Sequence, residues 1–290
     1  MILDLSYEYL TTLKDVTFPE GLTQLNLTSN RLTSLPPLPD TLTHLNCSRN
    51  QLTELPELPP NLILLHCFSN NLTSLPSLPD SLTTLDCSEN QLVSLPSLPS
   101  SLTRLACSSN RLNSLPPLPP QLNWLVCFSN KLTSLPPLPP LLKVLYCSHN
   151  QLTSFPPLPT SLVELYCSYN QLTSFSQLPK SLTRLYCSNN RLTRLPPLPP
   201  SLNGLNFYDN QLPDHYYDND NGMRKPIENL RVIILIDRWR KGLSILSRMV
   251  ADRAARNIQR VWKRYWLQPY PDAELGYHVA RYMLHYRYKL

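Results

Sequence analysis

The chain has 290 residues, of which 31 are proline, eight are cysteine and only five are glycine. So few glycines leave no Gly-x-Gly-x-x-Gly or Gly-x-x-x-x-Gly-Lys loop, which excludes the usual nucleotide-binding motifs. Residues 1–213 carry 11 Lys+Arg and 12 Asp+Glu, whereas residues 214–290 carry 15 and 8, so a nearly neutral body precedes a basic tail.

The body is built from a repeated unit. From Leu22 to a shortened copy at Leu202, the pattern L-x-x-L-x-C-x-x-N-x-L-x-x-L-P-x-L-P-x-x recurs every 20 residues, with Leu27 and Phe207 in place of the cysteine in the first and last copies. Before it, Leu3, Leu5, Leu10 and Leu13 follow the same spacing as a half unit, with a connection two residues longer. Self-similarity at a fixed period predicts a solenoid of stacked coils.

The positions within one unit predict its local structure. In an extended segment such as Leu45-Asn46-Cys47, alternate side chains point to opposite faces, so leucine and cysteine face inward. Proline fixes φ, so the Leu-Pro-x-Leu-Pro stretch favours polyproline II. The asparagine of each unit can donate and accept, which suits a buried ladder where the chain leaves the strand. One cysteine per 20 residues predicts small core residues rather than disulfides or a metal site.

This pattern resembles the leucine-rich repeat family, in its short twenty-residue class, over about residues 3–213. The resemblance implies an α/β repeat solenoid with a parallel β-sheet on a concave face and extended, polyproline II-like backbone on the convex side. Short-repeat proteins of this kind occur in bacterial effectors and, with basic IQ-like tails, in large DNA viruses of amoebae. That context implies action on a protein in the cytoplasm of a host cell.

The third, fifth and seventh residues of each unit should face outward, on the concave side. In the early units these residues are small or polar, as at Gln24 and Asn46, but in the later units they are large. Exposed aromatic residues with arginine are typical of protein-binding hot spots. We therefore predict a partner-binding surface formed by Arg104, Trp124, Phe128, Tyr146, Glu164, Tyr166, Arg184, Tyr186 and Tyr208.

Three alternatives accompany this prediction. The tyrosines at 146, 166 and 186 would also stabilise the strands simply by stacking. Leu64, His66 and Phe68 form a second, more isolated outward cluster. The Pro-Pro-Leu-Pro copies at 36–39, 116–119, 136–139, 156–159 and 196–199 resemble ligands of WW domains. We disfavour this last hypothesis because the solenoid needs the leucines of these segments inside.

The tail predicts an acidic linker at 214–222 and a basic helical cap at 223–290, with a first helix opening near Pro226. A second, basic amphipathic helix at 243–266 contains Ile258, Gln259, Trp262 and Lys263, which match the first half of an IQ motif. Such a helix suits a calmodulin-like protein or an anionic surface. The alternative role is to cover the open end of the solenoid.

Enzymatic activity is not predicted. Some effectors join such repeats to a ubiquitin-ligase domain with a cysteine nucleophile, but this chain has no cysteine after Cys187. No Ser–His–acid catalytic triad is recognisable in the sequence either. The sequence therefore predicts a non-catalytic module without cofactor or metal, which binds a protein or peptide rather than a small molecule, nucleic acid or membrane. The absence of a signal-peptide pattern at the amino end predicts a cytoplasmic protein.

Overall fold

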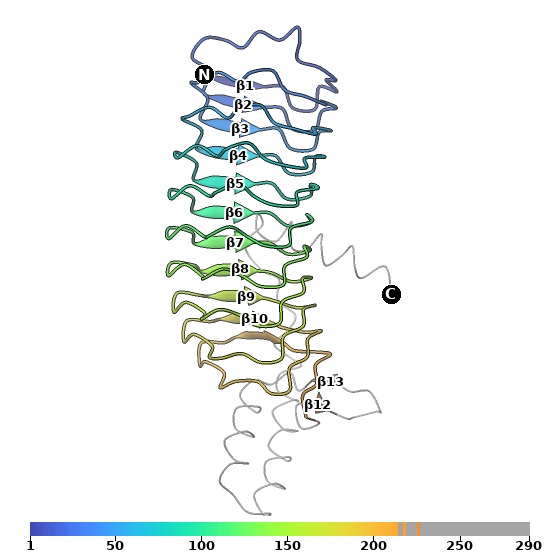
Figure 1. The fold of residues 1–290 in the computed structure, drawn as a ribbon, viewed down its shortest axis with the longest axis vertical. Helices are drawn as coiled ribbons and strands as arrows, with labels where there is room; N and C mark the ends of the chain where they lie inside the picture. The colour runs from blue at the N-terminus through green and yellow to red at the C-terminus, as the bar shows by residue number, and fades with distance from the viewer. Residues whose placement is uncertain (214–216, 219–224, 227–290) are drawn as a thin grey trace, which may run out of the picture. The chain divides into compact units, whose positions relative to one another are not determined.

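A computed structural model describes residues 1–213 and the backbone of residues 217–218 and 225–226. Its main element is one sheet of eleven parallel three-residue strands, in which successive strands of the chain are neighbours in space (Figure 1). This is the solenoid that the twenty-residue period predicts. The strands are β1 (Ile2–Asp4), β2 (Gln24–Asn26), β3 (His44–Asn46), β4 (Leu64–His66), β5 (Thr84–Asp86), β6 (Arg104–Ala106), β7 (Trp124–Val126), β8 (Val144–Tyr146), β9 (Glu164–Tyr166), β10 (Arg184–Tyr186) and β11 (Gly204–Asn206).

The strands pair in a constant register. Leu45 of β3 lies opposite Leu65 of β4, so equivalent positions of successive units face each other. At the amino end Leu3 of β1 lies opposite Leu25 of β2, an offset two residues longer than the usual twenty. The predicted half unit with a longer connection is therefore confirmed. Constant register places every outward side chain beside its equivalents in the two neighbouring coils.

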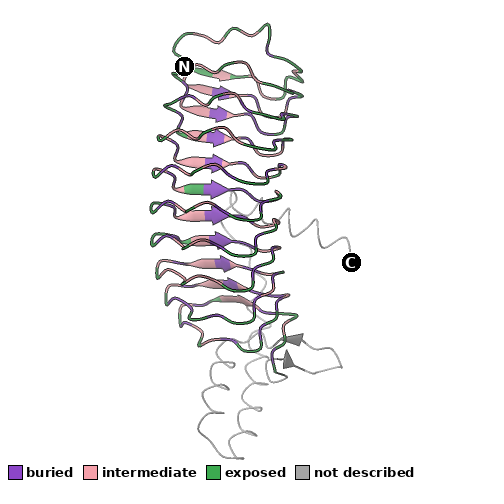
Figure 2. Ribbon diagram, viewed as in Figure 1, coloured by how far each residue is buried: buried purple, intermediate pink, exposed green. Residues whose placement is uncertain are grey.

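The core consists of columns that run from coil to coil (Figure 2). In one unit Leu102, Leu105, Cys107 and Leu112 are all fully buried, and the equivalent residues of the other units from Leu22 onward are buried as well, except the half-buried Leu205 of the last strand. Each buried leucine contributes about 1.5–3 kcal/mol, but only when the next coil covers it. The eight cysteines are free, buried thiols, which confirms the core role predicted for them. Burial raises the pKa of Cys127 to about 12, so the column is uncharged at neutral pH.

A ladder of buried asparagines connects the coils. The side-chain amide of Asn150 donates to the carbonyl oxygens of Cys127, at 3.0 Å, and Cys147, at 3.1 Å. Its Oδ1 accepts a hydrogen bond from the amide of Leu132 at 2.9 Å. The preceding residue, His149, has a φ of 54°, in the left-handed region, as do its equivalents in the other units. The asparagine thus satisfies backbone groups where the chain turns away from the strand, as predicted.

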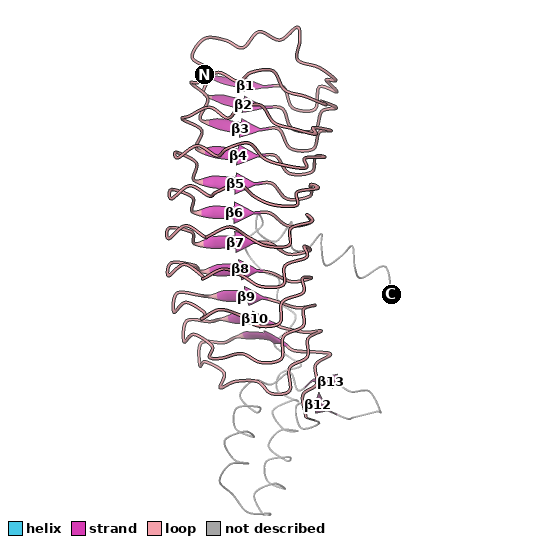
Figure 3. Ribbon diagram, viewed as in Figure 1, coloured by secondary structure: helices cyan, strands magenta, loops and turns pink. Residues whose placement is uncertain are grey.

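The remainder of each coil returns to the next strand without regular secondary structure (Figure 3). We call the Leu-Pro-x-Leu-Pro part of each unit the return segment. In the unit that precedes β7, Leu115 is buried but Leu118 is only half-buried. The expectation that both leucines lie inside is therefore wrong for the second one. The chain turns just after it, through a hydrogen bond from the amide of Leu122 to the carbonyl of Pro119, so Leu118 reaches only the margin of the core.

Beyond the repeats, the structure describes a short antiparallel pair that the sequence did not predict. β12 (Tyr217–Asp218) falls within the predicted linker, and β13 (Lys225–Pro226) includes the proline that we expected to open a helix. The predicted helical cap lies otherwise outside the described residues, and so do Ile258, Gln259, Trp262 and Lys263 of the IQ-like helix 243–266. The described part of the chain contains no helix of the length and apolar character that a membrane span requires.

Candidate partner-binding surface

The outward side chains of the strands and of the residues just after them form one continuous surface, which we call the sheet face. The structure brings all nine predicted binding residues onto this face, because they occupy the third, fifth or seventh position of units in constant register. Their exposure differs. Arg104 and Tyr208 are exposed, Trp124, Phe128, Glu164, Tyr166, Arg184 and Tyr186 are half-buried, and Tyr146 is buried.

Three tyrosines at the fifth position of successive units form what we call the tyrosine stack. The ring centroids of Tyr146 and Tyr166 are 4.2 Å apart with an interplanar angle of 9°. Those of Tyr166 and Tyr186 are 4.5 Å apart with an angle of 19°. Stacked aromatic pairs contribute about 0.5–1.5 kcal/mol beyond the area they bury. The predicted ladder of rings is therefore confirmed, and it stabilises the strands whether or not a partner binds.

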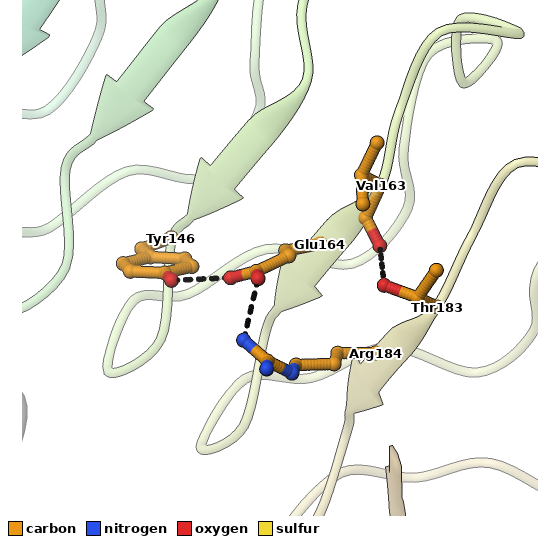
Figure 4. A network of polar contacts seen from close by, with 5 residues as sticks. All are labelled: Tyr146, Val163, Glu164, Thr183 and Arg184. Carbon is orange, nitrogen blue, oxygen red and sulfur yellow. Dashed lines mark hydrogen bonds and ion pairs between the residues drawn. The ribbon is translucent and has the colours of Figure 1, made fainter. Parts of the chain in front are cut away.

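Glu164 connects the stack to an arginine (Figure 4). The Tyr146 hydroxyl donates to Oε2 of Glu164 at 2.5 Å, and Nη1 of Arg184 donates to Oε1 at 2.6 Å. The side chain of Glu164 is 14% exposed and that of Arg184 is 37% exposed. One carboxylate thus holds both a phenol and a guanidinium, and this fixes three side chains that would otherwise be mobile on the surface.

The burial of Tyr146 corrects the expectation that all outward positions are exposed. Its residue exposure is 7%, because its ring packs against Tyr166 and its hydroxyl is held by Glu164. Val126 at the equivalent position of β7 is similarly covered, with 6% exposure. Small seventh residues such as Ser108 are buried as well. A partner would therefore contact the edges and hydroxyls of the stack rather than the ring faces within it.

The hydroxyls of Tyr146 and Tyr166 stay protonated far above neutral pH. Burial, followed by the negative charge of Glu164, raises the pKa of Tyr166 to about 12. Burial and the hydrogen bond to Glu164 raise the pKa of Tyr146 further still. The stack is consequently a neutral donor surface, and the charges beside it belong to Glu164 and Arg184.

A second group lies next to the stack toward the amino end. The guanidinium carbon of Arg104 lies 5.3 Å from the centroid of the Trp124 ring, within the range of a cation–π interaction. Within residues 1–213, the indole Nε1 of Trp124 is one of three buried side-chain polar atoms that have no hydrogen-bond partner. An unpaired buried donor costs about 1–3 kcal/mol. The exposed guanidinium of Arg104 therefore lies over a tryptophan ring whose indole N–H has no hydrogen-bond partner.

Sequence reasoning missed a parallel aromatic column one position after the sheet face. His149 stacks on Tyr169 with a centroid distance of 4.2 Å and an angle of 14°. Both residues precede the ladder asparagines and have positive φ values. The signal was present, because they occupy the same position in successive units. Strand alternation does not reveal this column, because both residues lie beyond the ends of β8 and β9.

The early coils have a different surface. Oδ1 of Asn46 accepts a hydrogen bond from the amide of Ser48 at 3.2 Å, and Asp86 makes the same short turn with Ser88. These side chains fold back on their own backbone instead of projecting outward. The second predicted cluster lies here, and in it Arg49 lies over the ring of Phe68. In the described part of the chain, no three His, Cys, Asp or Glu side chains are placed to hold a metal ion.

Comparison with known proteins identifies the repeats. The family model for two copies of leucine-rich repeats matches residues 140–180 and 160–199, and a single-repeat model matches 41–62 and 81–105. The leucine-rich effector protein YopM from Yersinia pestis is 30% identical over 73% of this chain and 79% of its own, with a TM-score of 0.50. The chain belongs to the leucine-rich repeat family.

Other solved leucine-rich repeat structures are similar to this chain as well. YopM from Yersinia enterocolitica is 39% identical over 68% of this chain, with a TM-score of 0.59, and the match spans 48% of that protein. A leucine-rich repeat protein from Leptospira interrogans is 28% identical over 67% of this chain and 63% of its own, with a TM-score of 0.53. No curated protein matches the chain. Leucine-rich repeats are generally non-catalytic scaffolds that bind other proteins.

Proposed function

We propose that the later coils, residues 101–213, bind a protein segment on the sheet face through the tyrosine stack and the arginines beside it. The observation that carries this proposal is the pairing of Glu164 with both Tyr146 and Arg184, because it holds a large polar and aromatic surface in one arrangement. A surface that is ordered before binding loses less conformational entropy when the partner docks.

The composition of the surface supports a protein partner. Tyrosine, tryptophan and arginine are the residues most enriched in protein-binding hot spots. The unpaired Trp124 Nε1 lies under Arg104, and the free energy that it costs is easier to explain at a functional surface than at a structural one. Ten strands after β1, spaced by about 4.8 Å, make a face that suits a protein or peptide better than a small molecule.

Charge favours an acidic partner. Residues 101–213 carry eight Lys+Arg and two Asp+Glu, whereas residues 1–100 carry three and ten. The binding half is thus basic although the repeat domain as a whole is nearly neutral. Positive charge on one half of an elongated molecule attracts an acidic segment and orients its approach. We expect the association rate to fall steeply with ionic strength, since exposed charges are screened over about 8 Å in physiological salt.

The experiment replaces Tyr166 and Tyr186 by asparagine in the full chain. Asparagine occupies the same position at Asn26, Asn46 and Asn206, so the fold accommodates it there. A photo-crosslinking residue is placed at position 208 of the chain. It should capture one partner protein reproducibly when the tyrosine stack is unchanged, and this capture should be lost in the double variant. The matched control is Asn26→Tyr plus Asn46→Tyr, which adds rings to the other half. Capture that is indifferent to Tyr166 and Tyr186 would reject the proposal.

We further propose that the partner is a host protein and that the chain acts in the host cytoplasm. The solved structure from Yersinia pestis is described as an effector protein, which supports this context without identifying the partner. The sequence also suggests a calmodulin-like partner for helix 243–266, which lies outside the described residues. A calcium-dependent interaction of the full chain with calmodulin, lost on Trp262→Ala, would support it, and calcium-independent behaviour would reject it.

A further inference from the structure

The return segments offer a second surface, on residues that the proposed function does not use. Their prolines differ in exposure along each segment. In the unit before β7, Pro116 is half-buried, Pro119 is buried, and Pro117 and Pro120 are exposed. The exposed pair is spaced by three residues, about one turn of a polyproline II helix, so both rings belong to one ridge of the segment.

Only some units place two prolines on this ridge. Pro117 and Pro120 are followed in the next coil by Pro137 and Pro140, which are exposed in the same way. Pro197 and Pro200 form a third exposed pair, but the adjacent coil has Gln177 and Lys180 at these positions, and an earlier unit has Glu57 and Pro60. Because successive coils are about 4.8 Å apart, the four prolines form a compact block on two adjacent coils.

An exposed leucine extends this block. Leu141 directly follows Pro140 and is 48% exposed. In six other units this position holds serine or threonine, whose hydroxyl donates to a leucine carbonyl of the preceding coil, as Ser101 does to Leu82 at 2.6 Å. At Leu141 this inter-coil hydrogen bond is replaced by exposed apolar surface. Such an exchange weakens the fold locally, so a role in binding explains it better than stability does.

The backbone of the block is available to a partner. The described chain forms no backbone–backbone hydrogen bonds to residues 115–118 or 135–138. The segments 112–122 and 132–142 contain no charged residue, whereas the equivalent segments of some other units contain Asp40, Glu57, Asp80 or Lys180. The carbonyl of Pro140 accepts a hydrogen bond from the Ser161 hydroxyl, so the backbone open to a partner is that of residues 115–118 and 135–138. A neutral ridge of proline rings on such a backbone matches the chemistry that proline-recognition domains use. Their aromatic side chains pack on proline rings, and polyproline II backbone carries no internal hydrogen bonds that a partner would have to break.

We propose that Pro117, Pro120, Pro137, Pro140 and Leu141, here called the proline patch, dock the aromatic-lined groove of a proline-recognition domain of the SH3 or WW type. Leu118 and Leu138, the second leucines of these two segments, are only half-buried, which removes the reason for which the sequence disfavoured this function. The proposal is independent of the tyrosine stack, because no residue of the patch lies on the sheet face.

The test uses the full chain and a panel of purified SH3 and WW domains, with binding measured by the fluorescence anisotropy of the labelled domains. We expect at least one domain to bind, and a free peptide with the sequence of residues 114–121 to compete. The quadruple variant P117S/P120S/P137S/P140S should weaken binding at least tenfold. We expect this variant to fold, because Ser97 and Ser100 occupy the same positions in a native unit.

Two further variants sharpen the test. Leu141→Ser introduces the hydroxyl found in six other units, so it should weaken binding several-fold while the melting temperature stays equal or rises. Ser97→Pro with Ser100→Pro extends the patch to a third adjacent coil and should tighten binding. A panel without any binder would overturn the proposal, as would equal binding of the quadruple variant and the unchanged chain. The double variant of Tyr166 and Tyr186 should bind the domains normally, which separates this proposal from the proposed function.

Discussion

The two halves of the sheet face share a backbone and differ in almost everything that projects from it. In the early coils, short side chains such as Asn46 bond to the amide two residues on, and the half is acidic. In the later coils, Tyr146, Glu164 and Arg184 contact one another across strands, and the half is basic. The same leucine, cysteine and asparagine columns lie beneath both. The inward columns therefore determine the fold, and the outward positions can diverge without disturbing it.

The largest expected effect tests whether the scaffold is equivalent in the two halves. Asn50→Ala and Asn150→Ala each leave one buried amide, that of Leu32 or Leu132, without its acceptor, and each removes the hydrogen bonds that the side chain donates to carbonyls. Those carbonyls keep a hydrogen bond from the neighbouring ladder asparagine. We expect each variant to lower the free energy of unfolding by about 2–3 kcal/mol, because an unsatisfied buried group costs about 1–3 kcal/mol and the lost hydrogen bonds add to it. Chemical denaturation measures this, with the exposed Asn113→Ala as a control that should change little. Unequal losses would show that the two halves do not share one scaffold.

The next effect should be confined to the later coils. Glu164→Gln keeps the shape of the side chain but removes the charge that faces Arg184 and the Tyr146 hydroxyl. Charge-assisted hydrogen bonds contribute about 1.5–3 kcal/mol, and partial exposure of Arg184 reduces this to a loss of about 1–2 kcal/mol. The matched control is Glu89→Gln in the early coils, where the exposed carboxylate has no such role. A loss no greater than that of the control would contradict the network.

Alkaline pH should separate the halves further. Folding raises the pKa of Tyr166 from 10.0 to about 12, so its contribution to stability is complete below pH 10 and is lost as pH rises toward 12. The buried cysteines behave alike in both halves, since the pKa values of Cys47 and Cys127 both rise from 9.0 to about 12. We expect Tyr166→Phe to reduce the loss of stability above pH 10. Denaturation curves at pH 8 and pH 11 measure it, and an unchanged difference between the two curves would refute the assignment.

The smallest effect concerns the early coils. Asn46→Ala removes the hydrogen bond to the Ser48 amide and should lower stability by about 0.5–1.5 kcal/mol, the usual net contribution of one such bond. Val126 occupies the same position in the later coils without a polar side chain. We therefore expect the fold to tolerate Val126→Asn. A loss of unfolding free energy larger than that of Asn46→Ala would show that the later half depends on its outward apolar packing.

Much of the fold could be predicted because it follows from one short pattern. Each unit repeats the residue types of Leu102, Leu105 and Cys107 at the same three positions. Each of these positions therefore identifies one inward column of the stack. The asparagine ladder follows from the same argument, as a residue that both donates and accepts is needed at each turn. The candidate surface was found in the same way, since the sites of Tyr146, Tyr166 and Tyr186 are equivalent. None of this required knowledge of distances between coils.

Burial on the surface could not be predicted, because it depends on neighbours that are 20 residues away. Tyr146 is covered only because Tyr166 and Glu164 stand beside it in the next coil. The second leucine of each return segment except Leu178 is half-exposed because the turn that follows it carries the chain back to the sheet. Leu141 is unusual only when the hydroxyls of its equivalents are seen to connect adjacent coils.

The amino-acid sequence by itself determined the parallel stack of coils, its length and its inward residues, since a twenty-residue period admits a buried core only when equivalent positions coincide. Only the tertiary structure decided which outward residues contact one another, which tyrosine is buried and which prolines are exposed. These properties arise from side chains on different coils that approach within a few ångströms. Such proximity is a property of the assembled stack and of no single unit.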